Sequence, residues 1–277
     1  MFSMSKILNL GVLAHVDAGK TSLTERILFE AGAITALGSV DSGTTHTDSM
    51  PLEQQRGITI RAAVASLQYN NCHINLLDTP GHPDFIAEVE RSLSVLDAVV
   101  LVISSVEGVQ PQTRRLARAI KSLNLPCVIF CNKIDRMGAR EESLLRELEA
   151  KLGWSILPLG TTVDIGTRAA TSHRFNECDE RLLETLAGFD DELLESWLER
   201  DEDVCPTAVN ASIRRATISG DLVPVLFGSA VTGSSMPSNR HRSMKCACAA
   251  LRSFSSTLRH LVMKSCGVMP SPGFLQD

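Results

Sequence analysis

The sequence lacks the features of a membrane-spanning, secreted or zinc-binding protein. No apolar run is long enough to cross a bilayer, and residues 1–6 lack the charged and apolar regions of a signal peptide. The eight cysteines form no pair of CxxC units and no Cys/His zinc spacing, a pattern typical of reduced cytosolic thiols. Cys127 and Cys131 flank an apolar segment, and we expect both in a buried strand. We therefore expect a cytoplasmic protein with no membrane partner.

The sequence also lacks an excess of positive charge. Its 27 Lys and Arg residues against 32 Asp and Glu residues give a formal net charge of −5 at pH 7. This balance argues against a nonspecific coat on nucleic acid, and we expect no sequence-specific DNA partner. It leaves room for a local basic face or for a phosphate pocket built from backbone amides. A length of 277 residues is enough for one large α/β domain or two ordinary ones.

Short apolar runs alternate with amphipathic segments from residue 7 to residue 130. The runs 74–77, 98–103 and 127–130 are continuous, as expected for parallel strands that are covered on both faces. Between the runs, apolar residues recur at helical spacing. One segment has Val89, Leu93 and Leu96, and the next has Leu116, Ile120 and Leu123. This alternation predicts a doubly wound, mostly parallel α/β sheet with ligands at the carboxyl ends of its strands.

A loop of small residues joins the buried strand predicted over 7–13 to a helix predicted over 22–31. Its sequence, AHVDAGKT, ends in Gly-Lys-Thr and has alanine where the strict phosphate-loop pattern begins with glycine. Backbone amides and the helix N-terminus offer partial positive charge to phosphates. Lys20 can reach the β- and γ-phosphates, and the Thr21 hydroxyl can ligate Mg²⁺. The predicted nucleotide-binding residues here are Ala14, His15, Val16, Asp17, Ala18, Gly19, Lys20, Thr21 and Ser22.

A polar segment separates this helix from the next predicted strand. Residues 33–55 are rich in Gly, Ser, Thr and Asp without a sustained apolar period, and we interpret them as a mobile loop. The loop leads into RGITI at 56–60, where Thr59 precedes the strand predicted over 60–67.

The motif DTPGH at 78–82 follows the strand predicted over 74–77. An aspartate at a strand end, here Asp78, is suited to hold a Mg²⁺ shell, and the backbone amide of Gly81 is suited to meet a γ-phosphate. The alternative interpretation is structural, with Asp78 as a helix cap and the Pro-Gly pair as a plain turn.

The motif NKID at 132–135 follows the strand predicted over 127–130. The Asp135 carboxylate, three residues after Asn132, can accept from the two donors on the Watson–Crick edge of guanine, while the stem of Lys133 packs over the base. The motif therefore predicts that Asn132, Lys133 and Asp135 select guanine over adenine. A surface turn with an exposed charge pair is the alternative.

One more strand end carries small residues. The run 223–227 is interpreted as a strand, and GSA follows it at 228–230. Small residues at this point allow backbone amides to approach a base, so Ser229 and Ala230 are predicted contacts. Five motifs then stand in order, each at a predicted strand end, and the set is far more specific than any single motif.

The ordered set resembles the G domain of the translational GTPases. Its signatures are AHVDAGKT at 14–21, RGITI at 56–60, DTPGH at 78–82, NKID at 132–135 and GSA at 228–230. Ala14 at the first loop position is usual in that family, and His82 after the glycine is a mark of the translation factors. The 92 residues between NKID and GSA are similar to elongation factor G and its relatives, which insert a subdomain there. The resemblance implies a G domain over 1–232, with the inserted subdomain at about 136–222.

Within that group, the sequence is most similar to the tetracycline-resistance ribosomal protection proteins. This likeness rests on LGSVD at 37–41, on the Gly-Thr-Thr and Thr-Asp that follow it, and on SLSVLD at 92–97. Elongation factor G and the release-factor-type GTPases are the alternatives, since they share the other signatures.

The resemblance implies hydrolysis of GTP to GDP and phosphate, with the ribosome as partner and activator. Thr21, Thr59 and Asp78 would hold Mg²⁺. Lys20, Thr59 and His82 would be the catalytic set, in which His82 orients the attacking water. Because no arginine finger is evident, unassisted turnover is expected to be slow, on the order of 10⁻⁴ to 10⁻³ per second. A remnant that binds GDP without useful turnover is the alternative from another class.

The composition changes near residue 233. From there to residue 277, six Lys or Arg residues stand against one acid, and the segment is also rich in Ser, Cys and Met. Family members continue into further domains that this sequence does not contain, so the resemblance implies a G domain followed by a frameshifted or otherwise aberrant end. A chain without those domains is not expected to make the contacts that displace tetracycline. The alternative is a true terminal helix, whose apolar stripe would be Leu251, Phe254, Leu258 and Leu261.

Overall fold

The structure is a computed structural model that describes residues 6–38, 63–69, 72–79, 92–177, 179–198 and 206–233. Several sequence predictions fall outside these ranges. They are the predicted site residues Thr59, Gly81 and His82, the RGITI motif, Val89, most of the loop predicted over 33–55, and the tail from residue 234 onward.

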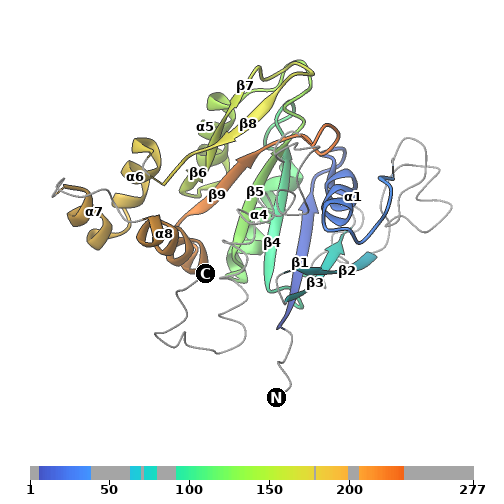
Figure 1. The fold of residues 1–277 in the computed structure, drawn as a ribbon, viewed down its shortest axis with the longest axis horizontal. Helices are drawn as coiled ribbons and strands as arrows, with labels where there is room; N and C mark the ends of the chain where they lie inside the picture. The colour runs from blue at the N-terminus through green and yellow to red at the C-terminus, as the bar shows by residue number, and fades with distance from the viewer. Residues whose placement is uncertain are drawn as a thin grey trace.

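The described residues form one large sheet with the strand order β2-β3-β1-β4-β5-β9-β6 (Figure 1). All neighbouring strands are parallel except β2 and β3, which are antiparallel. The antiparallel pair is joined by two residues only, and a connection that short cannot return a strand to parallel register. The strands are β1 (Lys6–Ala14), β2 (Ala63–Tyr69), β3 (Cys72–Asp78), β4 (Ala98–Ser104), β5 (Cys127–Asn132), β6 (Ile156–Pro158) and β9 (Val223–Phe227).

Both faces of the sheet are buried, which explains why its central strands have continuous apolar sequences. On β4, Val99, Leu101 and Ile103 belong to one core cluster, whereas the alternating Val100 and Val102 belong to another. The predicted doubly wound, mostly parallel α/β fold is therefore confirmed.

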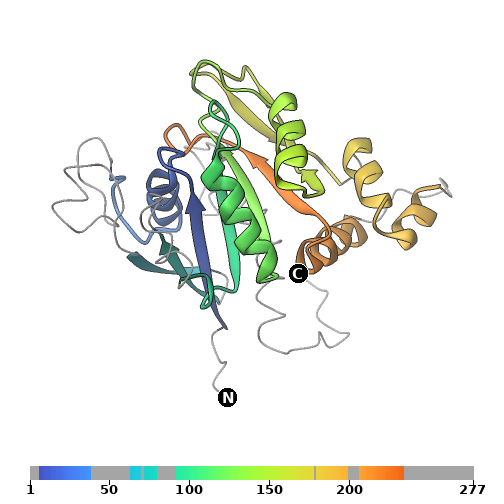
Figure 2. The ribbon, with the colours of Figure 1, turned by 180° about the vertical axis from the view of Figure 1, so that it is seen from behind.

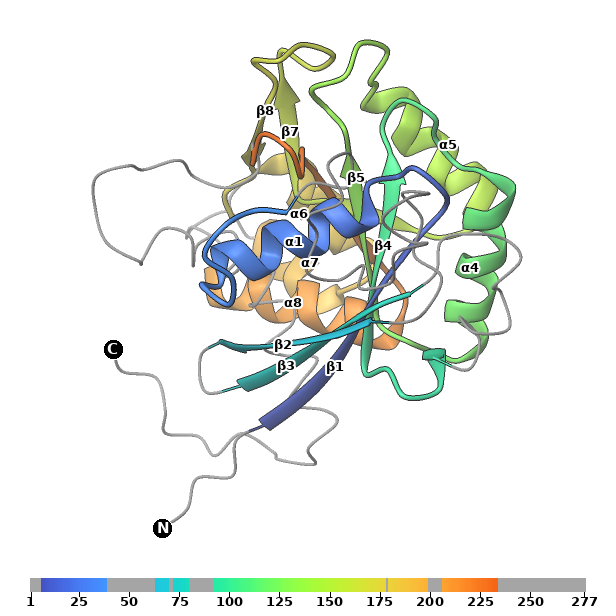
Figure 3. The same ribbon diagram turned by 90° about the vertical axis from the view of Figure 1, so that its right-hand side faces the viewer.

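Helices cover the two faces from opposite sides (Figures 2 and 3). Helix α1 (Lys20–Glu30) packs on one face, and α4 (Pro111–Ser122) with α5 (Glu142–Leu152) packs on the other. The predicted apolar stripe of α4 is correct for Leu116 and Ile120 but wrong for Leu123, which is 48% exposed. Leu123 follows the last helical residue, where the chain leaves the sheet. None of the helices in the described ranges has the length and apolar character needed to cross a bilayer.

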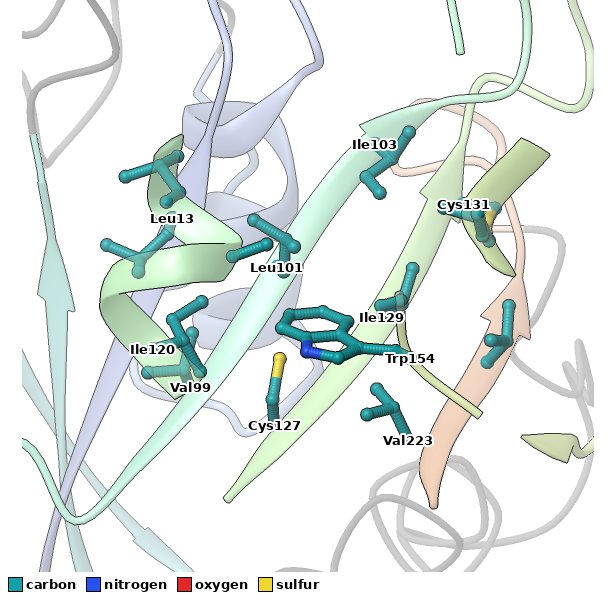
Figure 4. Packing of buried hydrophobic residues seen from close by; sticks show 14 of the residues in the cluster. Leu13, Val99, Leu101, Ile103, Ile120, Cys127, Ile129, Cys131, Trp154 and Val223 are labelled. Atoms are coloured by element: carbon teal, nitrogen blue, oxygen red, sulfur yellow. The ribbon is translucent and has the colours of Figure 1, made fainter. Parts of the chain in front are cut away.

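The core beneath α4 and α5 contains both cysteines of the central strand. The indole ring of Trp154 lies among Leu101, Cys127 and Ile129 (Figure 4). Burial raises the pKa of the Cys127 thiol to about 12, and it also raises the pKa of Cys131 well above its ordinary value. Both thiols are therefore protonated at neutral pH and serve as small apolar residues, as the sequence predicted.

The stretch 136–222 contributes to the main sheet and also extends beyond it. Helix α5 and strand β6 belong to the layers of the main sheet. Strands β7 and β8 form a separate antiparallel pair, and helices α6, α7 and α8 share a third apolar cluster. Their bounds are β7 (Gly160–Val163), β8 (Thr171–Arg174), α6 (Glu180–Ala187), α7 (Asp191–Leu198) and α8 (Pro206–Ser219). The β7–β8 pair is held to the start of α5 by the Glu141 carboxylate, which accepts hydrogen bonds from Thr161 and Thr162 of β7. Division of the chain at residue 232, with an inserted unit at about 136–222, stays a prediction.

Candidate functional site

The predicted motifs in the described residues converge because parallel strands end at one edge of the sheet. Ala14 of β1 lies in register with Val102 of β4, and Ser104 at the end of β4 lies in register with Asn132 of β5. Cys131 pairs in turn with Phe227 of β9. The loops that leave β1, β3, β4, β5 and β9 therefore share one rim, which is where doubly wound sheets bind ligands.

The loop after β1 presents an uncapped helix end. Gly19, the N-cap of α1, has a left-handed backbone with φ of 88° and no side chain of its own that could cap the helix. The first turn of α1 contains no acidic residue. The backbone N–H groups of that turn and the positive end of the helix dipole favour the binding of an anion such as phosphate.

Lys20, Thr21 and Asp78 form a buried polar cluster at this helix end. The Lys20 ammonium group is paired with the Asp78 carboxylate, and the Thr21 hydroxyl lies 3.5 Å from the other carboxylate oxygen. The distance from Lys20 Nζ to Thr21 Oγ1 is 3.4 Å. Asp78 is 0% exposed and Lys20 is 7% exposed, so a full negative charge and a full positive charge meet away from solvent.

The chemistry of this cluster suits a hard divalent cation. A hydroxyl and a carboxylate side by side supply oxygen ligands of the kind that Mg²⁺ prefers, and a cation there could replace Lys20 as the partner of the buried Asp78. The residues Thr21 and Asp78 therefore fit the predicted Mg²⁺ site. The third predicted ligand, Thr59, lies outside the described residues.

Asn132 joins the phosphate loop to the GSA loop. Its amide nitrogen donates to the carbonyl oxygen of Ala18 at 2.8 Å, and its amide oxygen accepts from the backbone N–H of Ala230 at 2.9 Å. The sequence placed Asn132 and the Ala230 amide at the base. In the structure these two groups bond to each other, so Asn132 fixes the shape of the site.

The GSA loop is held by a residue that the sequence analysis missed. Arg26 of α1 donates from Nε to the carbonyl of Ala230 at 3.0 Å and from Nη2 to the carbonyl of Val231 at 2.6 Å. The Ser229 hydroxyl accepts from the N–H of Thr232 at 3.2 Å within the same loop. No local signal marks Arg26, because its partners lie more than 200 residues away in the chain and only the fold brings them together.

The remaining predicted base and loop residues differ in exposure. Asp135 and Lys133 are half-buried beside Asn132. Lys133 has a left-handed backbone with φ of 67°. In the phosphate loop, Val16 and Ser22 are half-buried, and Asp17, with φ of 61°, is exposed.

His15 is buried and held at both ring nitrogens. Nε2 lies 3.2 Å from a carboxylate oxygen of Glu107, and Nδ1 lies 3.1 Å from the hydroxyl of Thr113 on α4. Because a carboxylate only accepts, Nε2 carries a hydrogen. Burial lowers the pKa of His15 below its ordinary value of 6.5, although the hydrogen bond to Glu107 acts in the opposite direction. His15 therefore supports the loop through its ring, and its contact with a nucleotide stays a prediction.

A phosphate loop after the first strand of the parallel core, combined with NKID after β5, is the architecture of a P-loop GTP-binding domain. The sequence model of the elongation factor Tu GTP binding domain matches residues 5–264. The chain belongs to this family, as its motifs predicted.

Proteins similar to this chain include several tetracycline resistance proteins. The oxytetracycline resistance protein of Streptomyces rimosus is 49% identical over 234 residues, which cover 83% of this chain and 35% of that protein. TetM of Streptomyces lividans is 48% identical, and the match covers 82% of this chain and 35% of TetM. TetP of Clostridium perfringens is 42% identical, and the match covers 83% of this chain and 36% of TetP. The chain thus spans about a third of the length of these curated relatives. The predicted resemblance to this group is confirmed.

A solved structure agrees with the fold. The crystal structure of a protein from Thermus thermophilus superposes with a TM-score of 0.76 at 27% sequence identity. The match covers 91% of this chain and 40% of that one.

Proposed function

We propose that this chain binds GTP with Mg²⁺ and hydrolyses it to GDP and phosphate as a translation-factor GTPase of the ribosomal protection type, acting at the ribosome in the cytoplasm. The observation that carries the proposal is the buried cluster of Lys20, Thr21 and Asp78 at the uncapped start of α1. Identity of 42% to 49% to tetracycline resistance proteins supports this type over elongation factor G and over release-factor-type GTPases.

The residues of the cluster have separate roles in this proposal. The amides at the start of α1 bind the phosphates, and Lys20 moves its charge from Asp78 to the β- and γ-phosphates when nucleotide enters. Thr21 and Asp78 would hold Mg²⁺, with Thr59 as a further ligand. The metal ion supplies charge neutralisation at the phosphate oxygens. His82 orients the attacking water and the Gly81 amide contacts the γ-phosphate.

Base selection rests on the loop after β5. The Asp135 carboxylate accepts from the Watson–Crick edge of guanine, and the stem of Lys133 packs on the base. Asn132 holds this loop against Ala18, so the base site and the phosphate site keep a fixed separation. Ser229 and Ala230 of the GSA loop contact the base from the other side.

Turnover is proposed to be slow until the ribosome activates it, because no arginine finger is evident in the sequence. A second candidate is a nucleotide-binding module that holds GDP without ribosome function.

The test begins with a fluorescent GDP analogue. We expect bound analogue to be displaced by GTP and not by ATP, with Lys20→Ala abolishing tight binding and Asp135→Asn weakening guanine selectivity. Lys121→Ala on α4 and Asp191→Asn on α7 are matched controls in exposed positions. Unchanged GDP affinity in both site variants contradicts the site assignment.

A second measurement separates the two candidate functions. Phosphate release is followed with and without ribosomes, after binding has been established. Ribosome-stimulated release supports the GTPase, whereas binding without stimulated release supports the GDP-binding module.

A further inference from the structure

Glu107 follows β4, midway along the rim between the phosphate loop and the base loop. One of its carboxylate oxygens lies 3.2 Å from Nε2 of His15, and the other lies 3.4 Å from Nζ of Lys133. The three residues follow three adjacent strands, β1, β4 and β5. We propose that Glu107 is a positioning residue for nucleotide binding, which fixes Lys133 over the base relative to the phosphate loop. The proposal deepens the proposed function and rests on it.

The backbone around Glu107 is fixed, so its carboxylate is a defined anchor. Its N–H donates to the Ser104 hydroxyl at 3.3 Å, and its carbonyl accepts from Nε2 of Gln110 at 2.9 Å. Gly108 next to it has a left-handed backbone, with φ of 69°, and donates to the carbonyl of Ser104 at 2.9 Å. With the backbone held in this way, only the side-chain rotamers of Glu107 have to be ordered when the bridge forms.

The two partners of Glu107 differ in mobility. His15 is 4% exposed and is also held by Thr113, so it forms the rigid side of the bridge. Lys133 has a long side chain that is 23% exposed. Without a partner for its ammonium group, this side chain could adopt several rotamers that place its stem differently. The bridge therefore restrains Lys133 and leaves His15 where it is.

This arrangement connects the two ends of a bound nucleotide. The phosphates lie on the loop that contains His15, and the base lies against Lys133. Holding Lys133 in its bound position before the nucleotide arrives lowers the entropic cost of binding, and the gain is expected in the dissociation rate. Base selectivity rests on Asp135 and is expected to stay the same.

The test is a double-mutant cycle on the release of a fluorescent GDP analogue. Glu107→Gln keeps the shape of the side chain and removes its charge, and we expect GDP to dissociate about 5-fold faster. In a Lys133→Ala background, we expect the same substitution to change the rate by less than about 2-fold, because the restrained group is gone. Glu149→Gln, at an exposed position on α5, is the matched control.

Additional readouts separate positioning from a structural role. We expect Glu107→Gln to keep the unfolding midpoint of the parent chain and its preference for GTP over ATP. The proposal is overturned if Glu107→Gln accelerates GDP release equally in the parent chain and in Lys133→Ala. It is also overturned if Glu107→Gln leaves GDP release unchanged. If Glu107→Gln does not fold, Glu107→Asp repeats the cycle, and failure of both variants to fold overturns it as well. Absence of GDP binding by the unmodified chain counts against the proposed function itself.

Discussion

A methyl group on Gly19 would overlap the side-chain amide of Asn132, so the phosphate loop and the base loop touch with no space for a side chain between them. Gly19 also has a φ of 88°, which side chains rarely adopt. An alanine at this position would therefore meet both backbone strain and a steric clash, and the clash involves a residue that holds two loops together.

The first prediction concerns this contact. We expect Gly19→Ala to lower the free energy of unfolding by about 2 to 4 kcal/mol, of which about 1 kcal/mol is backbone strain and the rest is overpacking. Gly32→Ala is the matched control, since Gly32 has a φ of 72° with no atom within 4 Å of an added Cβ. Denaturant unfolding of both variants checks this difference. Equal losses in the two variants would show that contact with Asn132 adds nothing.

The second prediction concerns the two hydrogen bonds of Asn132. Asn132→Asp keeps an acceptor for the N–H of Ala230 but places an oxygen against the carbonyl of Ala18. We expect a loss of about 2 to 3 kcal/mol of stability, because a buried donor is replaced by a charged acceptor facing another acceptor. Nucleotide affinity should fall with it. Asn124→Asp is the control for adding a negative charge, since Asn124 is exposed. Losses of similar size in both variants contradict this prediction.

The third prediction concerns the pH dependence of stability through His15. Burial lowers its pKa in the folded state, so the unfolded chain binds the proton more tightly. The stabilisation is then fully present above pH 6.5 and is lost as pH falls through the folded pKa. We expect the unmodified chain to lose stability between pH 7.5 and 5 more steeply than His15→Gln, by at most about 1.4 kcal/mol per pH unit.

Unfolding curves at several pH values measure this slope. His173→Gln is the control for loss of an imidazole at an exposed position. The prediction fails if the curves of the unmodified chain and of His15→Gln stay parallel over the whole range.

The fourth prediction concerns an unpaired hydroxyl at the end of β4. In the described part of the chain, Ser105 Oγ is buried and has no hydrogen-bond partner. Its neighbour Ser104 is equally buried, but its Oγ accepts from the N–H of Glu107. We expect Ser105→Ala to raise stability by up to about 1 kcal/mol and Ser104→Ala to lower it by about 1 kcal/mol. Thermal and denaturant unfolding of the pair check the opposite signs. Destabilisation by Ser105→Ala would indicate that this hydroxyl has a partner.

The central strands and the first helix could be predicted because their information is local. Continuous apolar runs placed β1, β3, β4, β5 and β9 to within a few residues, since a strand buried on both faces needs apolar side chains on both. Helix α1 starts two residues before its predicted beginning, at Lys20 of the phosphate loop itself. Leu123 fits the same helical period as Ile120 and is nevertheless exposed, because periodicity does not say where a helix leaves the sheet it covers.

The sequence by itself determined the order of the motifs, the alternation of strands and helices, and through them the α/β fold and the place of the site at the strand ends. Only the tertiary structure decided how the loops at that rim support one another. Arg26 reaches the GSA loop across 204 residues, and Asn132 reaches Ala18 across 114. The physical reason is that a strand or a helix follows from the pattern of its own residues, whereas a hydrogen bond between two loops depends on the register of the strands that precede them.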